Sequence, residues 1–196
     1  MAARQPTKQR LLDAGVRLFA EKGFSETTVG DIEAAVGLQP RRGALYRHFP
    51  SKEALLQVAL KQHLDSLADA DPNLQQLPST DTRTEALTIG RWLLAEVDRE
   101  QPIVRILEQD GDLLVALRDS FRRHLVDAGY VMVEQWLRGN AGTIDVEAVA
   151  VVLLGSLVNY RRSTWTFGKK PLGMDEERFL STWADMCVAA VQARGV

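Results

Sequence analysis

Several residue types that build common functional sites are scarce in this chain. Its 196 residues include one cysteine, Cys187, which excludes an intramolecular disulfide and fits a reducing compartment. One cysteine and three histidines, His48, His63 and His124, are also too few for an ordinary structural zinc site. We therefore expect neither a metal ion nor another cofactor.

Long apolar segments are missing too. The longest apolar run, at residues 146–158, is interrupted by Glu147, Gly155 and Ser156 and is too short to span a bilayer. The first ten residues are polar and lack the apolar core of a signal peptide. The sequence therefore predicts a cytoplasmic protein that has no membrane partner.

The sequence also lacks the patterns that enzymes use most often. It contains no glycine-rich phosphate loop, no cluster of metal ligands and no credible Ser-His-Asp arrangement. A pair of carboxylates, Glu176 and Glu177, is explained by the start of a helix, where acidic side chains complement the helix dipole. We expect no catalytic residue and no enzymatic activity.

What the sequence has in abundance is helical periodicity. Apolar residues recur at the spacing of a helix face nearly throughout, and no run alternates in the way of a β-strand. This pattern predicts an all-α fold. We expect helices at residues 8–22, 29–36, 43–48, 52–64, 82–99, 102–109, 112–138, 145–167 and 175–193, with the clearest loop at residues 71–81.

The first three of these helices are expected to form a small N-terminal head. Gly37 supplies the tight corner between the second and the third, as in a helix-turn-helix. On the third helix, Leu45 and Phe49 are expected to pack inward. The polar residues expected to face outward are Arg41, Arg42, Tyr46, Arg47 and His48.

The distribution of charge supports contact between this head and nucleic acid. Residues 1–55 hold nine Lys and Arg against six Asp and Glu, whereas the remainder holds fifteen against twenty. A basic head on an acidic body suits a protein that meets a phosphate backbone at one end.

A family resemblance strengthens this interpretation. The residues that carry it are Leu12–Ala14, Leu18, Phe19, Glu21, Gly23, Phe24, Thr27, Thr28, Ile32, Gly37, Leu38, Gly43, Leu45, Tyr46, His48, Phe49 and Ser51–Leu55. Together they resemble the N-terminal signature of the TetR family of bacterial regulators. The resemblance implies an all-α homodimer that binds near-palindromic double-stranded DNA and represses transcription. A small-molecule effector would release the protein from this DNA.

The same resemblance implies roles for single residues of the head. Thr28 would cap the second helix near a phosphate, and Lys52 would contact phosphate at the start of the fourth helix. Tyr46 and His48 would contact the sugar–phosphate backbone, although a structural role explains His48 equally well.

This chain departs from the family pattern in the turn of the head. Five residues, Leu38–Arg42, separate Gly37 from Gly43, which is two more than the pattern has. The longer turn would bring Arg41 and Arg42 to the tip of the reading helix. With Arg47, these arginines are the candidates for contacts with bases or phosphates, because arginine pairs readily with guanine.

We expect two domains, a helix-turn-helix head at residues 1–55 and a body at residues 56–196 for ligand binding and dimerisation. A ligand pocket combines aromatic walls with a few polar groups. The candidates are Trp92, Glu96, Arg105, Phe121, His124, Asn159 and Tyr160. Taken singly, each is better explained as core or surface, and the prediction is that a subset of them lines a cavity.

The last two helices carry apolar residues on more than one face, which predicts a second partner besides the body. A second copy of the chain would supply it in a two-fold four-helix interface. The residues assigned to this interface are Gly155, Phe179, Trp183, Met186 and Ala190. The alternative is a helical DNA-binding protein without a small-molecule inducer, and the large aromatic body argues against it.

Overall fold

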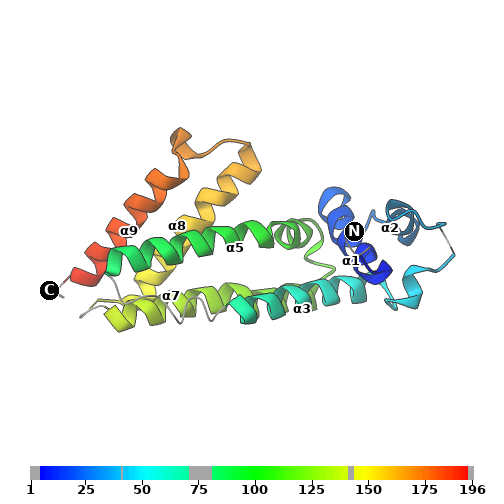
Figure 1. Ribbon diagram of the computed structural model, residues 1–196, viewed down its shortest axis with the longest axis horizontal. Helices are drawn as coiled ribbons and strands as arrows, with labels where there is room; N and C mark the ends of the chain where they lie inside the picture. The colour runs from blue at the N-terminus through cyan, green and yellow to red at the C-terminus, as the bar shows by residue number, and fades with distance from the viewer. Residues whose placement is uncertain (1–4, 41, 71–80, 141–143, 194–196) are drawn as a thin grey trace. The chain divides into compact units, whose positions relative to one another are not determined.

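The computed structural model describes residues 5–40, 42–70, 81–140 and 144–193. Within these ranges the chain is helical and has no strand, which confirms the all-α prediction (Figure 1). Of the sequence-based expectations, Arg41 and nearly all of the loop at 71–81 lie outside the described residues. None of the described helices combines the length and apolar character that crossing a membrane requires.

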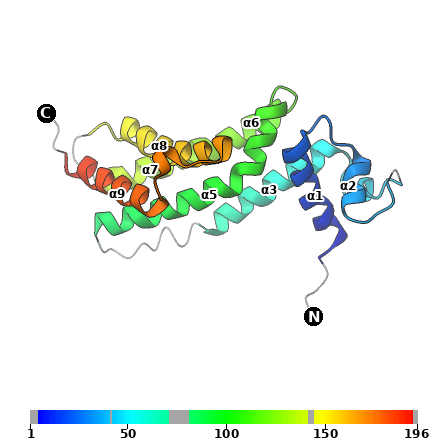
Figure 2. The same cartoon turned by 90° about the horizontal axis from the view of Figure 1, so that it is seen from above.

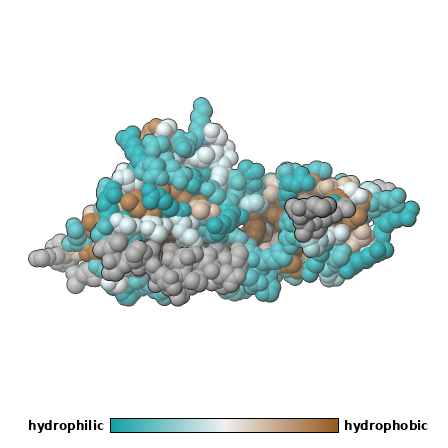
Figure 3. Space-filling view, in the orientation of Figure 1, coloured by the Kyte–Doolittle hydropathy of each residue, from teal (hydrophilic) through white to brown (hydrophobic). Residues whose placement is uncertain are grey.

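The chain separates into two compact units and passes from one to the other at residues 69–70, 99–100 and 122–123. Unit 1 contains residues 1–69 and 100–122, and unit 2 contains residues 70–99 and 123–196. Hydrophilic residues cover most of the face seen in Figure 3, as expected for units that keep their apolar side chains inside.

Unit 1 contains the N-terminal head, formed by α1 (Thr7–Lys22), α2 (Val29–Ala35), a short turn η1 (Leu45–Arg47) and the start of α3 (Lys52–Ala70) (Figure 2). The apolar stripes of these elements meet in a common core. Fully buried members of that core are Leu11, Phe19, Ile32, Leu45 and Leu55. Burial of each such side chain contributes roughly 1.5–3 kcal/mol to the stability of unit 1.

The third element of the head is shorter than the sequence predicts. Instead of a helix at residues 43–48, the structure has a single 3-10 turn, η1, with no side-chain cap at Ala44. Gly43 has a φ of 68°, a left-handed conformation that a helix does not accommodate. Pro50 then prevents the turn from growing into α3.

The predicted break between helices at 82–99 and 102–109 is wrong. A single helix, α5 (Thr82–Asp110), runs through Pro102. Proline in a helix interior removes one hydrogen bond and strains the preceding turn. Val97 and Ile103, on either side of it, are both buried, and the packing of these flanking turns outweighs that loss.

The predicted helix at 112–138 is divided into three pieces. α6 (Val115–Phe121) passes into a π-helical turn at Arg122–Val126, which leads into α7 (Asp127–Asn140). A π-helical turn shifts the hydrogen-bonding register within a helix, and periodicity in the sequence does not reveal it.

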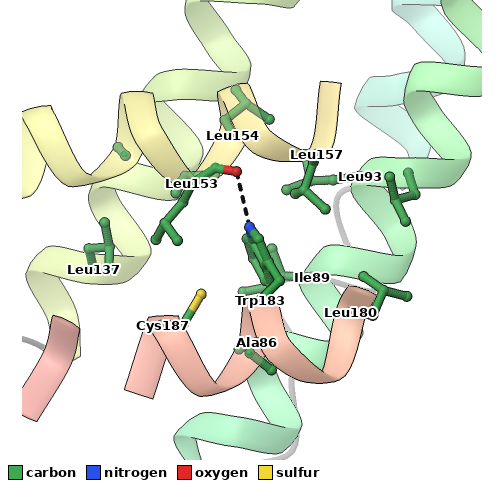
Figure 4. Close-up of a cluster of buried hydrophobic side chains, with 14 of the residues drawn as sticks. Ala86, Ile89, Leu93, Leu137, Leu153, Leu154, Leu157, Leu180, Trp183 and Cys187 are labelled. Atoms are coloured by element: carbon green, nitrogen blue, oxygen red, sulfur yellow. Dashed lines mark hydrogen bonds between the residues drawn. The ribbon is translucent and has the colours of Figure 1, made fainter. Parts of the chain in front are cut away.

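Unit 2 is built from α7, α8 (Val146–Phe167), α9 (Glu176–Gln192) and the first part of α5. Its core gathers side chains from all four helices around Trp183 (Figure 4). The indole Nε1 of Trp183 donates a hydrogen bond of 3.0 Å to the carbonyl of Leu153. This bond satisfies the only polar atom of a buried tryptophan and ties α9 to α8.

Gly90 allows α9 to pack closely against α5. A Cβ atom at this position would lie 3.0 Å from Leu180 and 3.1 Å from Trp183. A larger residue would push the Leu180 or Trp183 side chain back, so glycine favours this close approach of α9 to α5.

Candidate nucleic-acid interface

Exposed polar side chains gather on and beside η1. Tyr46 is 57% exposed, and Arg42, Arg47 and His48 are also exposed. Leu45 and Phe49, which the sequence predicts to pack inward, are 0% and 1% exposed, and this prediction is confirmed. The exposed residues therefore form a polar surface over two buried apolar side chains.

Thr28 begins α2 through a reciprocal capping box. Its hydroxyl accepts a hydrogen bond of 3.1 Å from the amide of Asp31, and the Asp31 carboxylate accepts one of 2.9 Å from the amide of Thr28. The backbone and side-chain hydrogen bonds from Thr28 lower the pKa of the Asp31 carboxyl. Thr28 itself remains exposed, as a phosphate contact would require.

Lys52, the predicted phosphate contact on α3, is engaged within its own unit. Its ammonium donates hydrogen bonds of 2.8 Å to the carbonyl of Phe24 and 2.7 Å to that of Thr27. It also lies over the Phe24 ring, 4.6 Å from the centroid. Lys52 therefore holds the turn between α1 and α2 in place.

The same turn is held by Asp110, a residue that sequence reasoning did not single out. Its carboxylate accepts hydrogen bonds of 2.7 Å from the amide of Phe24 and 2.6 Å from the hydroxyl of Ser25. Burial opposes ionisation of Asp110, but the hydrogen bonds from Ser25 and Phe24 and the charge of Lys52 outweigh it and lower its pKa. No local sequence pattern predicts the contact between Asp110 and Phe24, because these residues lie 86 positions apart.

Arg10 supports the other end of α2. Its guanidinium donates a hydrogen bond to the carbonyl of Val36, at the C-terminal end of the helix. Carbonyls at a helix end have no partner within the helix, and a positive charge there also complements the dipole. Both ends of α2 are thus secured.

The predicted ligand-binding residues are divided between the units. Arg105, exposed, and Phe121, buried, belong to unit 1, whereas the other five belong to unit 2. Among those, Trp92 is half-buried and His124 and Asn159 are exposed.

Of the five predicted ligand-binding residues in unit 2, Tyr160 and Glu96 are buried. The Tyr160 ring stacks on Phe179 with centroids 4.2 Å apart, and its hydroxyl donates a hydrogen bond of 3.0 Å to the carbonyl of Met174. Glu96 is 5% exposed and accepts a hydrogen bond of 2.5 Å from Arg99. Tyr160 therefore has a structural place in the core, while Glu96 is a buried charged group on α5, one turn before the half-buried Glu100.

The predicted dimer residues differ in exposure. Trp183 is 2% exposed and fills the core of its own unit, so its side chain is not on the surface. Met186, by contrast, is 51% exposed. Gly155, Phe179 and Ala190 are half-buried, and a Cβ atom added at Gly155 would meet no other atom within 4 Å.

Comparison with known proteins places the head in a known family. Residues 11–59 match the model of the bacterial regulatory proteins of the tetR family. The HTH-type transcriptional regulator AcrR of Shigella flexneri is 45% identical over 188 residues, covering 88% of this chain and 84% of that protein.

Other relatives match less of their length or share only the fold. The probable acrEF/envCD operon repressor of Escherichia coli is 32% identical over 111 residues, and this match spans less than half, 46%, of that protein and 52% of this chain. The crystal structure of reduced NemR from E. coli has a TM-score of 0.68 at 16% identity, covering 97% of this chain and all of that one. At that identity the similarity shows the fold alone.

Proposed function

This chain belongs to the tetR family of bacterial regulatory proteins, and we propose that it is a homodimeric, ligand-responsive DNA-binding repressor of transcription. Its head would bind near-palindromic double-stranded DNA, and a small, largely apolar molecule bound by unit 2 would release it. Regulators of this family are transcription factors and not enzymes, in agreement with the sequence-based expectation.

The observation that carries the DNA-binding proposal is the polar surface around η1. Arg42, Tyr46 and Arg47 are exposed over the buried pair Leu45 and Phe49. Arginine and tyrosine side chains supply the contacts to base edges and phosphates that DNA recognition needs. The names of the relatives, a transcriptional regulator and an operon repressor, support the same function.

Thr28 and His48 complete the proposed interface as backbone contacts. Both side chains are exposed, and Thr28 is the N-cap of α2. The His48 imidazole would contact a phosphate directly, whereas the Thr28 hydroxyl, which donates a hydrogen bond of 2.8 Å to the Asp31 carboxylate, would exchange that bond for one to a phosphate. We retain Arg41 in the proposal from its place in the sequence. The role of Lys52 is modified: with its ammonium on two carbonyls, it would serve mainly to hold the α1–α2 turn.

The proposal of a ligand in unit 2 rests on polar groups within an aromatic and aliphatic environment. Trp92 is packed against the core of this unit, and Glu96 places a charged group beside it on α5. Aromatic walls with a few fixed polar groups are typical of small-molecule sites. The ligand would be largely apolar, with a group that hydrogen-bonds to Glu96.

The proposal of a homodimer rests on apolar side chains that the subunit leaves exposed on α8 and α9. Val151, Val152 and Met186 are 55%, 61% and 51% exposed. A second copy applied to the same two helices would bury these side chains in a four-helix interface. Two heads related by two-fold symmetry would then read the two halves of a palindrome.

The deciding experiment selects duplexes bound by the full-length protein from a random DNA library. The proposal expects an enriched near-palindrome, and no enrichment would contradict it. The enriched duplex is then screened for release by a library of apolar compounds. Linkage requires that the duplex weaken compound binding by the same factor as the compound weakens DNA binding. Enrichment without any releasing compound would favour the alternative, a DNA-binding protein that lacks an inducer.

A further inference from the structure

Glu33 is a buried acidic residue of the head that the proposed interface does not use. Its side chain is 0% exposed. A carboxylate removed from water is costly unless it is hydrogen-bonded, so its contacts indicate what it stabilises. The sequence contained a signal for this burial, because Glu33 lies four residues after Val29 and three before Val36, on the stripe that packs inward.

The carboxylate of Glu33 binds the start of η1. Its Oε1 accepts a hydrogen bond of 3.0 Å from the amide of Leu45, 12 residues further along the chain. Leu45 is the first residue of η1, and Ala44 before it provides no side-chain cap. The first amides of a helical turn have no partner within that turn, so Glu33 caps η1 from a distant position in the sequence.

The backbone carbonyl of the same residue binds the other end of the connecting segment. It accepts a hydrogen bond of 2.9 Å from the amide of Leu38. Gly37 and Gly43, with φ of 74° and 68°, turn the chain close to the two attachment points. One residue of α2 therefore holds both Leu38 and Leu45, the ends of the segment that contains Arg42.

We infer that Glu33 is a positioning residue for sequence-specific DNA binding. The backbone carbonyl at position 33, which any residue supplies, holds the Leu38 end of residues 38–45, whereas the Glu33 carboxylate holds the Leu45 end. The carboxylate therefore determines where Arg42 and Tyr46, on either side of that attachment point, stand on the surface of the head. This inference rests on the proposed function. A base contact requires an arginine at a defined position, whereas attraction to phosphates tolerates displacement. Loss of the Glu33 carboxylate therefore acts on specific binding and leaves non-specific binding nearly intact.

The test compares Glu33→Ala, Glu33→Gln and Glu33→Met in the full-length protein. The probes are the duplex selected by the wild type from random DNA and a scrambled duplex of the same composition. Glutamine retains an oxygen that can accept from Leu45, whereas methionine fills the space without one. Alanine and methionine are expected to weaken binding to the selected duplex roughly 10-fold or more. Glutamine is expected to stay within about threefold of the wild type, and the scrambled duplex within about twofold for all variants.

A matched control removes one negative charge from the surface of the same head. Glu21 is exposed on α1, and Glu21→Ala reports the effect of charge alone on both duplexes. A second measurement needs no variant: hydrogen exchange of the Leu45 amide in the wild type. The bond to Glu33 predicts slow exchange at this position, although it begins a turn of three residues.

The outcomes separate the inference from the proposed function. A wild type that selects no duplex overturns the proposed function. A wild type that selects a duplex, with Glu33→Ala or Glu33→Met binding it equally well, overturns the positioning role alone. Equal losses of affinity for the selected and scrambled duplexes also overturn the positioning role. Rapid hydrogen exchange of the Leu45 amide overturns it as well, and this measurement on the wild type tests the role even if the variants fail to fold.

Discussion

The carboxylate of Asp110, at the end of α5, accepts a hydrogen bond of 2.6 Å from the hydroxyl of Ser25, in the turn between α1 and α2. The same carboxylate binds the neighbouring amide of Phe24, and Lys52 binds the carbonyl of Phe24. The turn that leads into the Thr28 cap is therefore held between one negative and one positive side chain, both inside unit 1. This arrangement makes the head sensitive to residues outside the helix-turn-helix itself.

Replacing Asp110 by Asn is expected to destabilise the protein by about 1–3 kcal/mol, because an amide cannot accept both bonds of the carboxylate. Thermal unfolding at pH 7 measures the loss. Asp112→Asn is the matched control, since that carboxylate is fully exposed and lies 3.7 Å from Arg118. Equal effects of the two substitutions would contradict the role given to Asp110.

The contribution of Asp110 also has a defined pH dependence. Its pKa is lowered in the folded protein, so its stabilisation is present above the pKa of the unfolded chain. It is lost as the pH falls through the lower, folded pKa. The difference in unfolding temperature between wild type and Asp110→Asn should therefore shrink in acid, and a difference that stays constant would refute this account.

Lys52→Met is expected to lower the free energy of unfolding by about 1–3 kcal/mol, because two carbonyls lose a charged donor. Lys61→Met is the control, since the side chain of Lys61 is 73% exposed in an ion pair with Asp65. Such surface pairs contribute about 0–1 kcal/mol. A loss of DNA affinity in Lys52→Met without any loss of stability would instead support the direct phosphate contact that the family resemblance implies.

Arg42→Ala is expected to weaken binding of the selected duplex by about 1–3 kcal/mol and to relax its preference at one base position. Repeating the duplex selection with the variant measures the preference. Arg91→Ala in unit 2, which removes an exposed arginine paired with Glu177, controls for net charge. A loss that is equal for all sequences would assign Arg42 to phosphate.

Met186→Asp is expected to separate the dimer, because a charge would be buried between two apolar faces. Light scattering should give twice 21.8 kDa for the wild type and 21.8 kDa for the variant. Val131→Asp is the control, as Val131 is 48% exposed on α7, outside the proposed interface. A monomeric wild type would contradict the proposed interface. Trp183→Asp, by contrast, should unfold unit 2, because Trp183 is buried in its core.

Cys187 is expected to resist thiol reagents in the native protein. It is buried, and burial raises the pKa of its thiol to about 12, so the reactive thiolate is scarce at pH 8. Because the folded pKa is raised, the neutral buried thiol contributes its full stability below the thiol pKa of the unfolded chain. That stability is lost as the pH rises from the unfolded pKa through the folded value of about 12. Labelling with a maleimide should be fast in urea and slow without it. Fast native labelling would show that unit 2 opens readily.

The sequence by itself determined the all-α class, the positions of most helices and the family, because these depend on short-range patterns. The Thr28 cap joins residues three apart, and the inward-facing pair Leu45 and Phe49 follows from helical spacing. Such features depend on neighbouring residues and can be predicted without knowledge of the fold. The signature of the head consists of them almost entirely.

Only the tertiary structure decided which contacts complete the head and which face of the last helix lies inside. The continuity of α5 through Pro102 depends on packing that outweighs a local preference. The excess of apolar residues on α9 did not reveal that Trp183 turns inward and Met186 outward. Glu33 and Asp110 reach their partners across 12 and 86 residues. Such contacts arise only after the helices pack, because the free energy of bringing distant groups together comes from burial of the whole core and not from the sequence around either residue.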